Sequence, residues 1–273
     1  MDRRNIKGVA LDVDGTLLHS GEHVAAPIAA ACEELVQAGI WLTLMSARPA
    51  TSIARIARQI GSGGPWGALN GALVVDREMK IRARSSIPEA AACRLIARCA
   101  ELPHISTCIY SAFDLYTPAF DRRVASEAEI VDSDLKIGLL GLDPASVDKI
   151  LLMADPVEVS GVMEALGGLR EDVCISVSKP GYIEISHQLA GKGWALTQCA
   201  IEKKLDLSSV AVVGDGENDV DMFRVSGFSA AMSHSPLRVR AAAKVVLDES
   251  ENALATFLRT LIPKGASSQA ASS

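Results

Sequence analysis

The 273-residue sequence contains no apolar run close to the roughly 18 residues that a membrane-spanning helix needs. Its N-terminal stretch, MDRRNIKGVALD, carries charges but has neither an apolar core nor a small-residue cleavage site, so we expect no secretory signal. Together these two absences predict a cytoplasmic protein without a membrane partner.

Basic residues are too few to predict a nucleic-acid-binding surface. The chain has 27 Lys and Arg against 33 Asp and Glu, a net charge of −6. A protein that binds nucleic acid needs a basic stripe to neutralise phosphates, so we do not expect nucleic acid as a partner. A local positive pocket for a small anion is compatible with this charge balance.

The six cysteines form neither a CxxC pair nor the Cys/His spacing of a zinc site. Most of them lie in apolar stretches of the sequence. This pattern predicts buried, reduced thiols.

Strand-length apolar runs alternate with helical patterns in the first seventy residues. We expect strands at 6–12, 40–46 and 66–70, and helices at 26–38 and 49–60, with Pro27 and Pro49 in their first turns. The strand runs are apolar throughout, which is typical of parallel strands buried on both faces. The order predicts an α/β fold with a Rossmann-like parallel sheet.

The rhythm changes after residue 72. A hairpin pattern around a DRE turn leads to a helix at 87–102, and mixed short elements follow to about residue 186. Strand and helix patterns then alternate again, with helices at 191–204, 217–226, 236–243 and 251–262 and strands at 209–214, 228–232 and 244–247. We therefore predict a core domain from residues 1–83 and 187–264, an inserted α+β domain at 84–186, and a disordered polar tail at 265–273.

Polar side chains follow the expected core strands at the edge where an open parallel sheet binds its ligands. Asp12 and Asp14 end the first strand, Ser46 ends the second, and Asp215 follows a later one. Lys192 opens the helix where the core resumes. We expect these side chains to converge on one crevice.

The residue types suit phosphate and metal chemistry. Two carboxylates in different environments can divide the roles of nucleophile and proton donor. The loop GDGENDVD offers Asp215 and Asp219 as oxygen ligands for a hard cation such as Mg²⁺. A hydroxyl before a helix and a lysine are suited to phosphate. Taken singly, Ser46 is better explained as a helix N-cap and Lys192 as a solvated lysine.

Four motifs in this order resemble the haloacid dehalogenase-like (HAD) superfamily, and within it the Cof-type hydrolases. They are LDVDGTLL at 11–18, LMSARP at 44–49, LAGKGWAL at 189–196 and VVGDGENDVDM at 212–222. One departure follows the fourth motif, where AMSHS stands at 231–235 in place of a stretch like AMGNA. We expect His234 to cap the next helix, and His19 and His23 to lie on the surface.

The resemblance implies a phosphatase that hydrolyses small phosphomonoesters, such as sugar phosphates, with Mg²⁺ and an aspartyl-phosphate intermediate. Asp12 would be the nucleophile and a Mg²⁺ ligand. Asp14 would bind Mg²⁺ through its carbonyl and act as general acid, then general base. Asp215 would be the third metal ligand, and Asp219 would hold Lys192 or a metal-bound water.

The resemblance also implies how the phosphate is held. Ser46, Lys192 and Asn218 would bind it, helped by backbone N–H groups near Val13 and Ala47. The inserted domain would be a cap that closes over the active site and selects the substrate. Candidates for substrate contact in the cap are Arg84, Arg122, Arg123 and Lys179.

Three other functions stay open on the sequence alone. A phosphomutase of the same superfamily would return the phosphoryl group to a substrate. A signalling receiver also uses acids, a hydroxyl and a lysine, but its acceptor Asp would not belong on the first strand. A binding protein without activity is disfavoured, because all four motifs keep their reactive side chains. A monomer and a homodimer are both compatible with the sequence.

Overall fold

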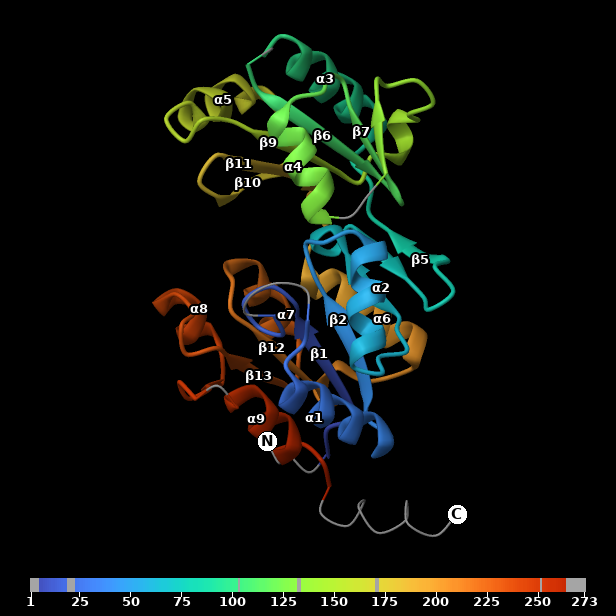
Figure 1. Ribbon diagram of the computed structural model, residues 1–273, viewed down its shortest axis with the longest axis vertical. Helices are drawn as coiled ribbons and strands as arrows, with labels where there is room; N and C mark the ends of the chain where they lie inside the picture. The colour runs from blue at the N-terminus through green and yellow to red at the C-terminus, as the bar shows by residue number, and fades with distance from the viewer. Residues whose placement is uncertain are drawn as a thin grey trace. The chain divides into compact units, whose positions relative to one another are not determined.

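The computed structural model describes residues 5–18, 23–102, 104–131, 134–169, 172–250 and 252–263. The chain divides into two compact units, which Figure 1 shows in ribbon form. The core unit consists of residues 1–83 and 191–273, and the inserted unit consists of residues 84–190. The predicted tail at 265–273 and His19 lie outside the described residues.

The core unit contains an eight-stranded sheet in the order β14-β13-β12-β1-β2-β3-β4-β5. Its strands are β1 (Gly8–Asp12), β2 (Trp41–Met45), β3 (Trp66–Ala68), β4 (Leu73–Val75), β5 (Ile81–Arg84), β12 (Val210–Gly214), β13 (Phe228–Ala231) and β14 (Val245–Val246). The pairs from β14 through β3 are parallel, whereas β4 runs antiparallel to β3. The predicted parallel-sheet α/β fold is confirmed.

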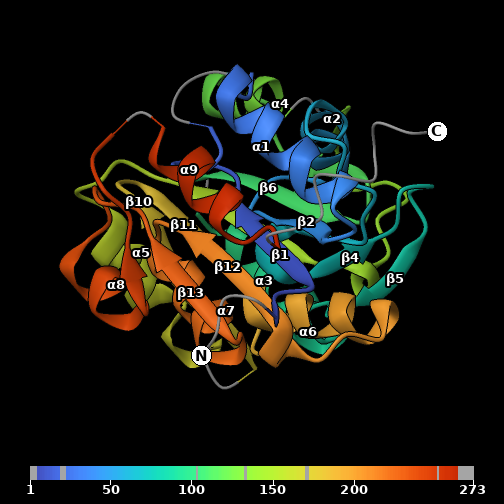
Figure 2. The same ribbon diagram turned by 90° about the horizontal axis from the view of Figure 1, so that it is seen from below.

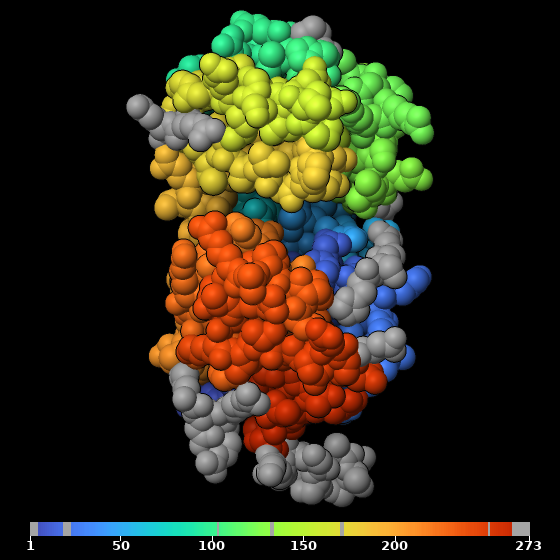
Figure 3. Space-filling model, turned by 90° about the vertical axis from the view of Figure 1, so that its left-hand side faces the viewer, coloured from blue at the N-terminus to red at the C-terminus, as the bar shows by residue number. Residues whose placement is uncertain are grey.

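Helices cover both faces of this sheet, as the view in Figure 2 shows. They are α1 (Ala26–Gln37), α2 (Ala50–Gln59), α6 (Lys192–Lys203), α7 (Val220–Val225), α8 (Leu237–Ala242) and α9 (Ala253–Thr260). One cluster of buried apolar residues joins the sheet to α6, α7 and α8, and α1 packs with α9 on the opposite face. In the space-filling view of Figure 3, the orange-to-red last part of the chain forms most of the visible core surface.

The main boundary differences in the core lie at helix starts. Pro27 is in the first turn of α1, as predicted, but Pro49 occupies the N-cap position of α2, which begins at Ala50. The predicted helix at 217–226 is a 3₁₀ turn (Glu217–Asp219) followed by α7. Gly39 has φ +77 just past α1, in the left-handed conformation that glycine adopts without steric cost.

The inserted unit contains a six-stranded sheet in the order β10-β11-β9-β6-β7-β8. Its elements are α3 (Glu89–Ala100), β6 (Ser106–Ser111), β7 (Asp114–Thr117), α4 (Arg122–Val131), β8 (Leu135–Ile137), β9 (Lys149–Met153), α5 (Val159–Ala165), β10 (Val173–Lys179) and β11 (Tyr182–His187). Ile109 joins the apolar cluster with α3 and α5, whereas its neighbour Tyr110 bonds to Glu127 of α4. The helices therefore lie on both faces of this sheet.

Two general expectations concern the whole chain. All six cysteines are free thiols, four of them buried, while Cys93 and Cys174 are exposed. None of the described helices combines the length and apolar character needed to cross a membrane.

Candidate active site

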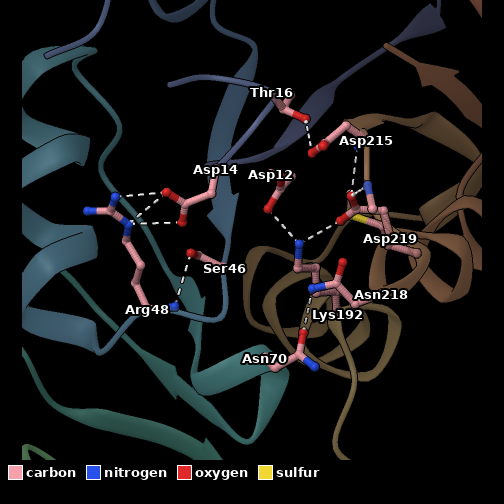
Figure 4. Close-up of polar contacts among 12 residues, drawn as sticks. Asp12, Asp14, Thr16, Ser46, Arg48, Asn70, Lys192, Asp215, Asn218 and Asp219 are labelled. Atoms are coloured by element: carbon pink, nitrogen blue, oxygen red, sulfur yellow. Dashed lines mark hydrogen bonds and ion pairs between the residues drawn. The ribbon is translucent and has the colours of Figure 1, made fainter. Parts of the chain in front are cut away.

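Asp12 lies at the carboxyl end of β1, a strand whose five residues are all buried. Its own exposed fraction is 4%, and its Oδ1 accepts a hydrogen bond of 2.5 Å from Lys192 Nζ (Figure 4). Burial raises the pKa of Asp12 well above the usual range, and the neighbouring Asp219 and Asp215 add to the rise, while Lys192 opposes it. Asp12 is thus a carboxylate whose charge depends on a cation beside it.

Lys192 is the first residue of α6 and is almost completely buried, so it is not the solvated lysine of the simpler explanation. Its Nζ lies 2.5 Å from Asp12 Oδ1 and 2.6 Å from Asp219 Oδ1. Burial by itself lowers the pKa of Lys192, but the two carboxylates outweigh it and raise the pKa. The acids also offset the unfavourable position of a cation at a helix N-terminus.

Asp219 uses both of its oxygens to organise the loop after β12. Oδ1 accepts the bond from Lys192, and Oδ2 accepts the backbone N–H groups of Asp215 and Gly216, at 2.9 and 2.8 Å. A side chain at Gly214 is excluded, because its Cβ would lie 2.4 Å from the Asp219 carboxyl carbon. Asp219 is therefore placed to hold Lys192 and the Asp215 backbone.

Asp215 is half-buried and stands beside the loop that follows β1. Its Oδ1 accepts a hydrogen bond of 3.2 Å from the Thr16 hydroxyl. Gly15 has φ +87, and a Cβ there would lie 2.3 Å from Asp215 Oδ2. Only glycine therefore permits this close approach of the two loops.

The acidic cluster fits a divalent cation. Carboxylate oxygens of Asp12, Asp215 and Asp219 all lie within 4.8 Å of one another. Lys192 bonds to Asp12 and Asp219, and Asp215 adds a third carboxylate, so the cluster carries surplus negative charge in a largely buried place, where Mg²⁺ binds through oxygen ligands. The side chain of Asp14 is not a member of this group.

Asp14 points instead toward Arg48, as Figure 4 shows. The Arg48 guanidinium donates from Nε to Asp14 Oδ2 at 2.9 Å and from Nη2 to Oδ1 at 2.8 Å. The Asp14 side chain is 55% exposed and that of Arg48 15% exposed. The sequence motifs gave no sign of this pair, because nothing in them fixes the direction of a long side chain.

Ser46 is completely buried at the end of β2. Its Oγ accepts the backbone N–H of Arg48 at 3.1 Å, and the N-cap of α2 is Pro49, so the N-cap explanation of Ser46 is wrong. Ala47 is half-buried, and Val13 is buried between Asp12 and Asp14. The structure thus places Ser46 with Arg48 and Asp14, beside the cluster of Asp12, Lys192, Asp215 and Asp219 (Figure 4).

Asn218 is exposed, and its Nδ2 donates to Asn70 Oδ1 at 3.0 Å. Asn70 belongs to three successive residues with left-handed backbone, with φ of 52, 56 and 88 at Leu69, Asn70 and Gly71. A Cβ at Gly71 would lie 2.0 Å from the carbonyl oxygen of Gly191, directly before Lys192. This strained segment links the loop after β3 to Asn218 and to the start of α6.

The histidines differ from expectation at one position. His234 Nε2 lies 3.6 Å from Asp215 Oδ2, and the residue at the N-cap of α8 is Pro236. The expected capping role of His234 is therefore wrong. His23 is exposed, as predicted.

Comparison with known proteins places this geometry in a family. Residues 9–258 match the family model of haloacid dehalogenase-like hydrolases. The 5-amino-6-(5-phospho-D-ribitylamino)uracil phosphatase YwtE of Bacillus subtilis (strain 168) is 24% identical over 285 residues, covering 94% of this chain and 98% of that protein.

Solved structures show the same fold. A haloacid dehalogenase-like hydrolase from Bacteroides thetaiotaomicron superposes with a TM-score of 0.84 at 23% identity, covering 94% of this chain and 99% of that one. The subclass IIB sugar phosphatase BT4131 has a TM-score of 0.76 at 17% identity, with 93% and 98% covered.

These matches confirm the resemblance predicted from the four motifs. They also confirm the predicted enzyme class at the level of a hydrolase, and the relatives named as phosphatases support its phosphoric monoester part.

Proposed function

The chain belongs to the haloacid dehalogenase-like hydrolases, and from that premise we propose that it is a Mg²⁺-dependent phosphatase of small phosphomonoesters. The observation that carries the proposal is the pair of buried contacts that Lys192 makes with Asp12 and Asp219 at the end of β1, beside Asp215. Phosphoryl transfer needs positioning and charge stabilisation above all, and these residues provide both.

The proposed reaction has two steps on Asp12. In the first, a carboxylate oxygen of Asp12 forms a bond to phosphorus, the ester P–O bond breaks, and Asp14 gives a proton to the leaving oxygen. In the second, Asp14 takes a proton from water, the water oxygen bonds to phosphorus, and the bond to Asp12 breaks. The products are an alcohol and inorganic phosphate, and both aspartates return to their initial states.

The other residues neutralise Asp12 and hold the phosphoryl oxygens. Lys192 neutralises Asp12 and the phosphoryl oxygens, and Ser46, Asn218 and the backbone near Val13 and Ala47 hold those oxygens. Asp219 keeps Lys192 in place through the 2.6 Å contact. Its two oxygens are already engaged, which supports this role over that of a metal ligand.

The carboxylates of Asp12 and Asp215 and the carbonyl of Asp14 would hold the Mg²⁺. When bound, Mg²⁺ supplies charge neutralisation between the crowded carboxylates and the incoming phosphate. The surplus of acids over lysine in the cluster supports this assignment.

We also propose that the inserted domain, residues 84–186, chooses the substrate. Among its candidates, Arg84 pairs with the buried Asp148 at 2.7 Å, which suits a structural role. Arg122 and Arg123 line a cavity of about 450 Å³ together with Met153 and Tyr182. The names of the ribitylaminouracil phosphatase and the sugar phosphatase support a sugar-phosphate-like substrate.

The test is an assay of the purified protein with p-nitrophenyl phosphate and a panel of sugar phosphates. We expect phosphate release with Mg²⁺, none with excess EDTA, and none from Asp12→Asn, whose fold should persist. Asp134→Asn, an exposed acid in the inserted unit, is the matched control and should keep full activity. Undiminished turnover by Asp12→Asn would exclude Asp12 as the nucleophile.

A further inference from the structure

Arg48 makes a bidentate contact with the carboxylate of Asp14 through two nitrogen atoms of its planar guanidinium group. Nη2 donates to Oδ1 at 2.8 Å, and Nε donates to Oδ2 at 2.9 Å and more weakly to Oδ1 at 3.2 Å. This fork matches the shape of a carboxylate, so the contact fixes the orientation of Asp14 as well as its charge. A lysine at the same position could supply the charge but not the fork.

Arg48 is itself held at several points. Its backbone N–H donates to Ser46 Oγ at 3.1 Å, and its carbonyl oxygen accepts the N–H of Leu69 at 2.9 Å. Its Nη1 donates to Ser52 Oγ on α2 at 3.3 Å. The Arg48 side chain is therefore held in one position, where it extends from the loop after β2 to the loop after β1.

Asp14 depends on a fixed partner more than Asp12 and Asp219 do. Asp12 and Asp219 are buried and bonded to Lys192, whereas the Asp14 side chain is 55% exposed and follows the end of its strand. An exposed carboxylate that lacks a fixed partner samples several rotamers, and ordering it costs free energy. Its proposed role requires one position, because it must reach the leaving oxygen and later a water.

We propose that Arg48 is a positioning residue for proton transfer, holding the Asp14 carboxyl group where, in its protonated form, it gives a proton to the leaving group. The inference rests on the proposed function, since it assigns Arg48 through the role of Asp14. The fork occupies one edge of the carboxylate, which has about four lone-pair sites, so lone pairs remain for the proton.

The test is the dependence of kcat/KM on the leaving group. This ratio covers the steps up to cleavage of the ester bond, so later hydrolysis of the intermediate does not enter it. p-Nitrophenolate leaves without protonation, whereas an alkoxide requires a proton. In Arg48→Gln, kcat/KM for alkyl phosphates should fall about ten- to a hundredfold, while that for p-nitrophenyl phosphate stays within about threefold of wild type.

Two further variants separate positioning from structure. Arg48→Lys keeps the charge without the fork, and it should show the same selective loss. Adding Arg48→Gln to Asp14→Asn should cause no further selective loss, because the arginine acts through that carboxylate. Arg48→Lys remains informative if Arg48→Gln proves unstable.

The matched control is Arg259→Gln. Arg259 forks the carboxylate of Glu34 on the core surface with the same donor atoms, Nε and Nη2, at 2.9 and 2.8 Å. Its loss should lower kcat/KM equally little for every leaving group.

Three outcomes would overturn an assignment. An equal loss for all leaving groups in Arg48→Gln means that Arg48 acts on structure or binding, and a gain for alkyl phosphates means that it restrains Asp14. Either result rejects the inference and leaves the phosphatase intact. A wild-type protein that hydrolyses no phosphate ester rejects the proposed function itself.

Discussion

The core unit and the inserted unit both bury charged side chains, but they balance them differently. In the core, Asp12, Asp215 and Asp219 form one cluster, and its single lysine, Lys192, pairs with Asp12 and Asp219. In the inserted unit, Asp148 is fully buried yet accepts hydrogen bonds from Arg84, Ser86 and the Ala112 N–H. A matched set of contacts maintains a fold, whereas an unmatched cluster has capacity left for a ligand.

The test with the largest expected effect replaces one buried lysine in each unit with methionine. Lys192→Met removes the cation between Asp12 and Asp219, and activity should fall by about a thousandfold or more. Lys149, 4% exposed and 3.8 Å from Glu184, is the counterpart in the inserted unit. Lys149→Met should leave activity within a few-fold and lower thermal stability instead, as steady-state rates and a melting curve would show.

If both lysine variants lost activity equally, the contrast between the units would not hold. Equal retention of activity would be just as damaging, because Lys192 would then have no chemical role.

A second test concerns stability in the inserted unit. Asp148→Ala leaves the Arg84 guanidinium, the Ser86 hydroxyl and the Ala112 N–H without their acceptor, so the free energy of unfolding should fall by about 3 kcal/mol. Urea unfolding followed by circular dichroism measures it. Asp134→Asn, an exposed change in the same unit, should alter the midpoint negligibly.

Mg²⁺ itself should sharpen the contrast without any assay of activity. At about a hundred times its dissociation constant, a ligand adds about 2.7 kcal/mol of stability, which shifts Tm by several degrees for a chain of this size. Wild type should show this upward shift with Mg²⁺, and Asp215→Asn should show little of it. An undiminished shift in that variant would place the ion elsewhere.

The smallest expected effect is a pH dependence at the start of α4. Burial acts to raise the pKa of Asp121, but hydrogen bonds from Ser106 and from the Val124 N–H outweigh it and lower the pKa. Because the pKa is lowered, the contribution of Asp121 to the free energy of unfolding is complete above the unfolded-state pKa near 4. It disappears as the pH falls through the folded-state pKa.

Asp121→Ala should therefore cost about 1 kcal/mol at neutral pH, as the loss of a helix cap does. The difference from wild type should shrink toward pH 3 in urea melts. A constant difference across that range would contradict the capping role.

Which parts of the molecule could be predicted depends on how local their physical cause is. The core strands are short apolar runs, and polar residues at their ends must share one edge of a parallel sheet, so the approach of Asp12 and Asp215 followed from topology. Lys192 stands at a helix start, where a cation is unfavourable to the helix dipole and therefore requires acids nearby. Which role each residue plays in the reaction stays a prediction.

Other features depend on tertiary packing and could not be predicted. The sequence pattern does not predict the helix α4, because RRVASEAEIV is mostly polar and buries only Val124, Glu127 and Val131. Nor does it identify the strand β9, because a short apolar run such as KILLM fits a strand or a buried helix equally well. The contact of Arg48 with Asp14 joins residues 34 positions apart through a flexible side chain.

The close approach of Gly71 to Gly191 has a consequence for how the chain is assembled. These residues stand on either side of the inserted unit in sequence, yet their backbones touch within the core unit. The segments that lead into and out of the inserted unit are therefore packed against each other in the core unit, at the contact between Gly71 and Gly191. Contacts within the core unit therefore fix the distance between Ser46 and Lys192. The length and sequence of the inserted unit can change without altering that distance.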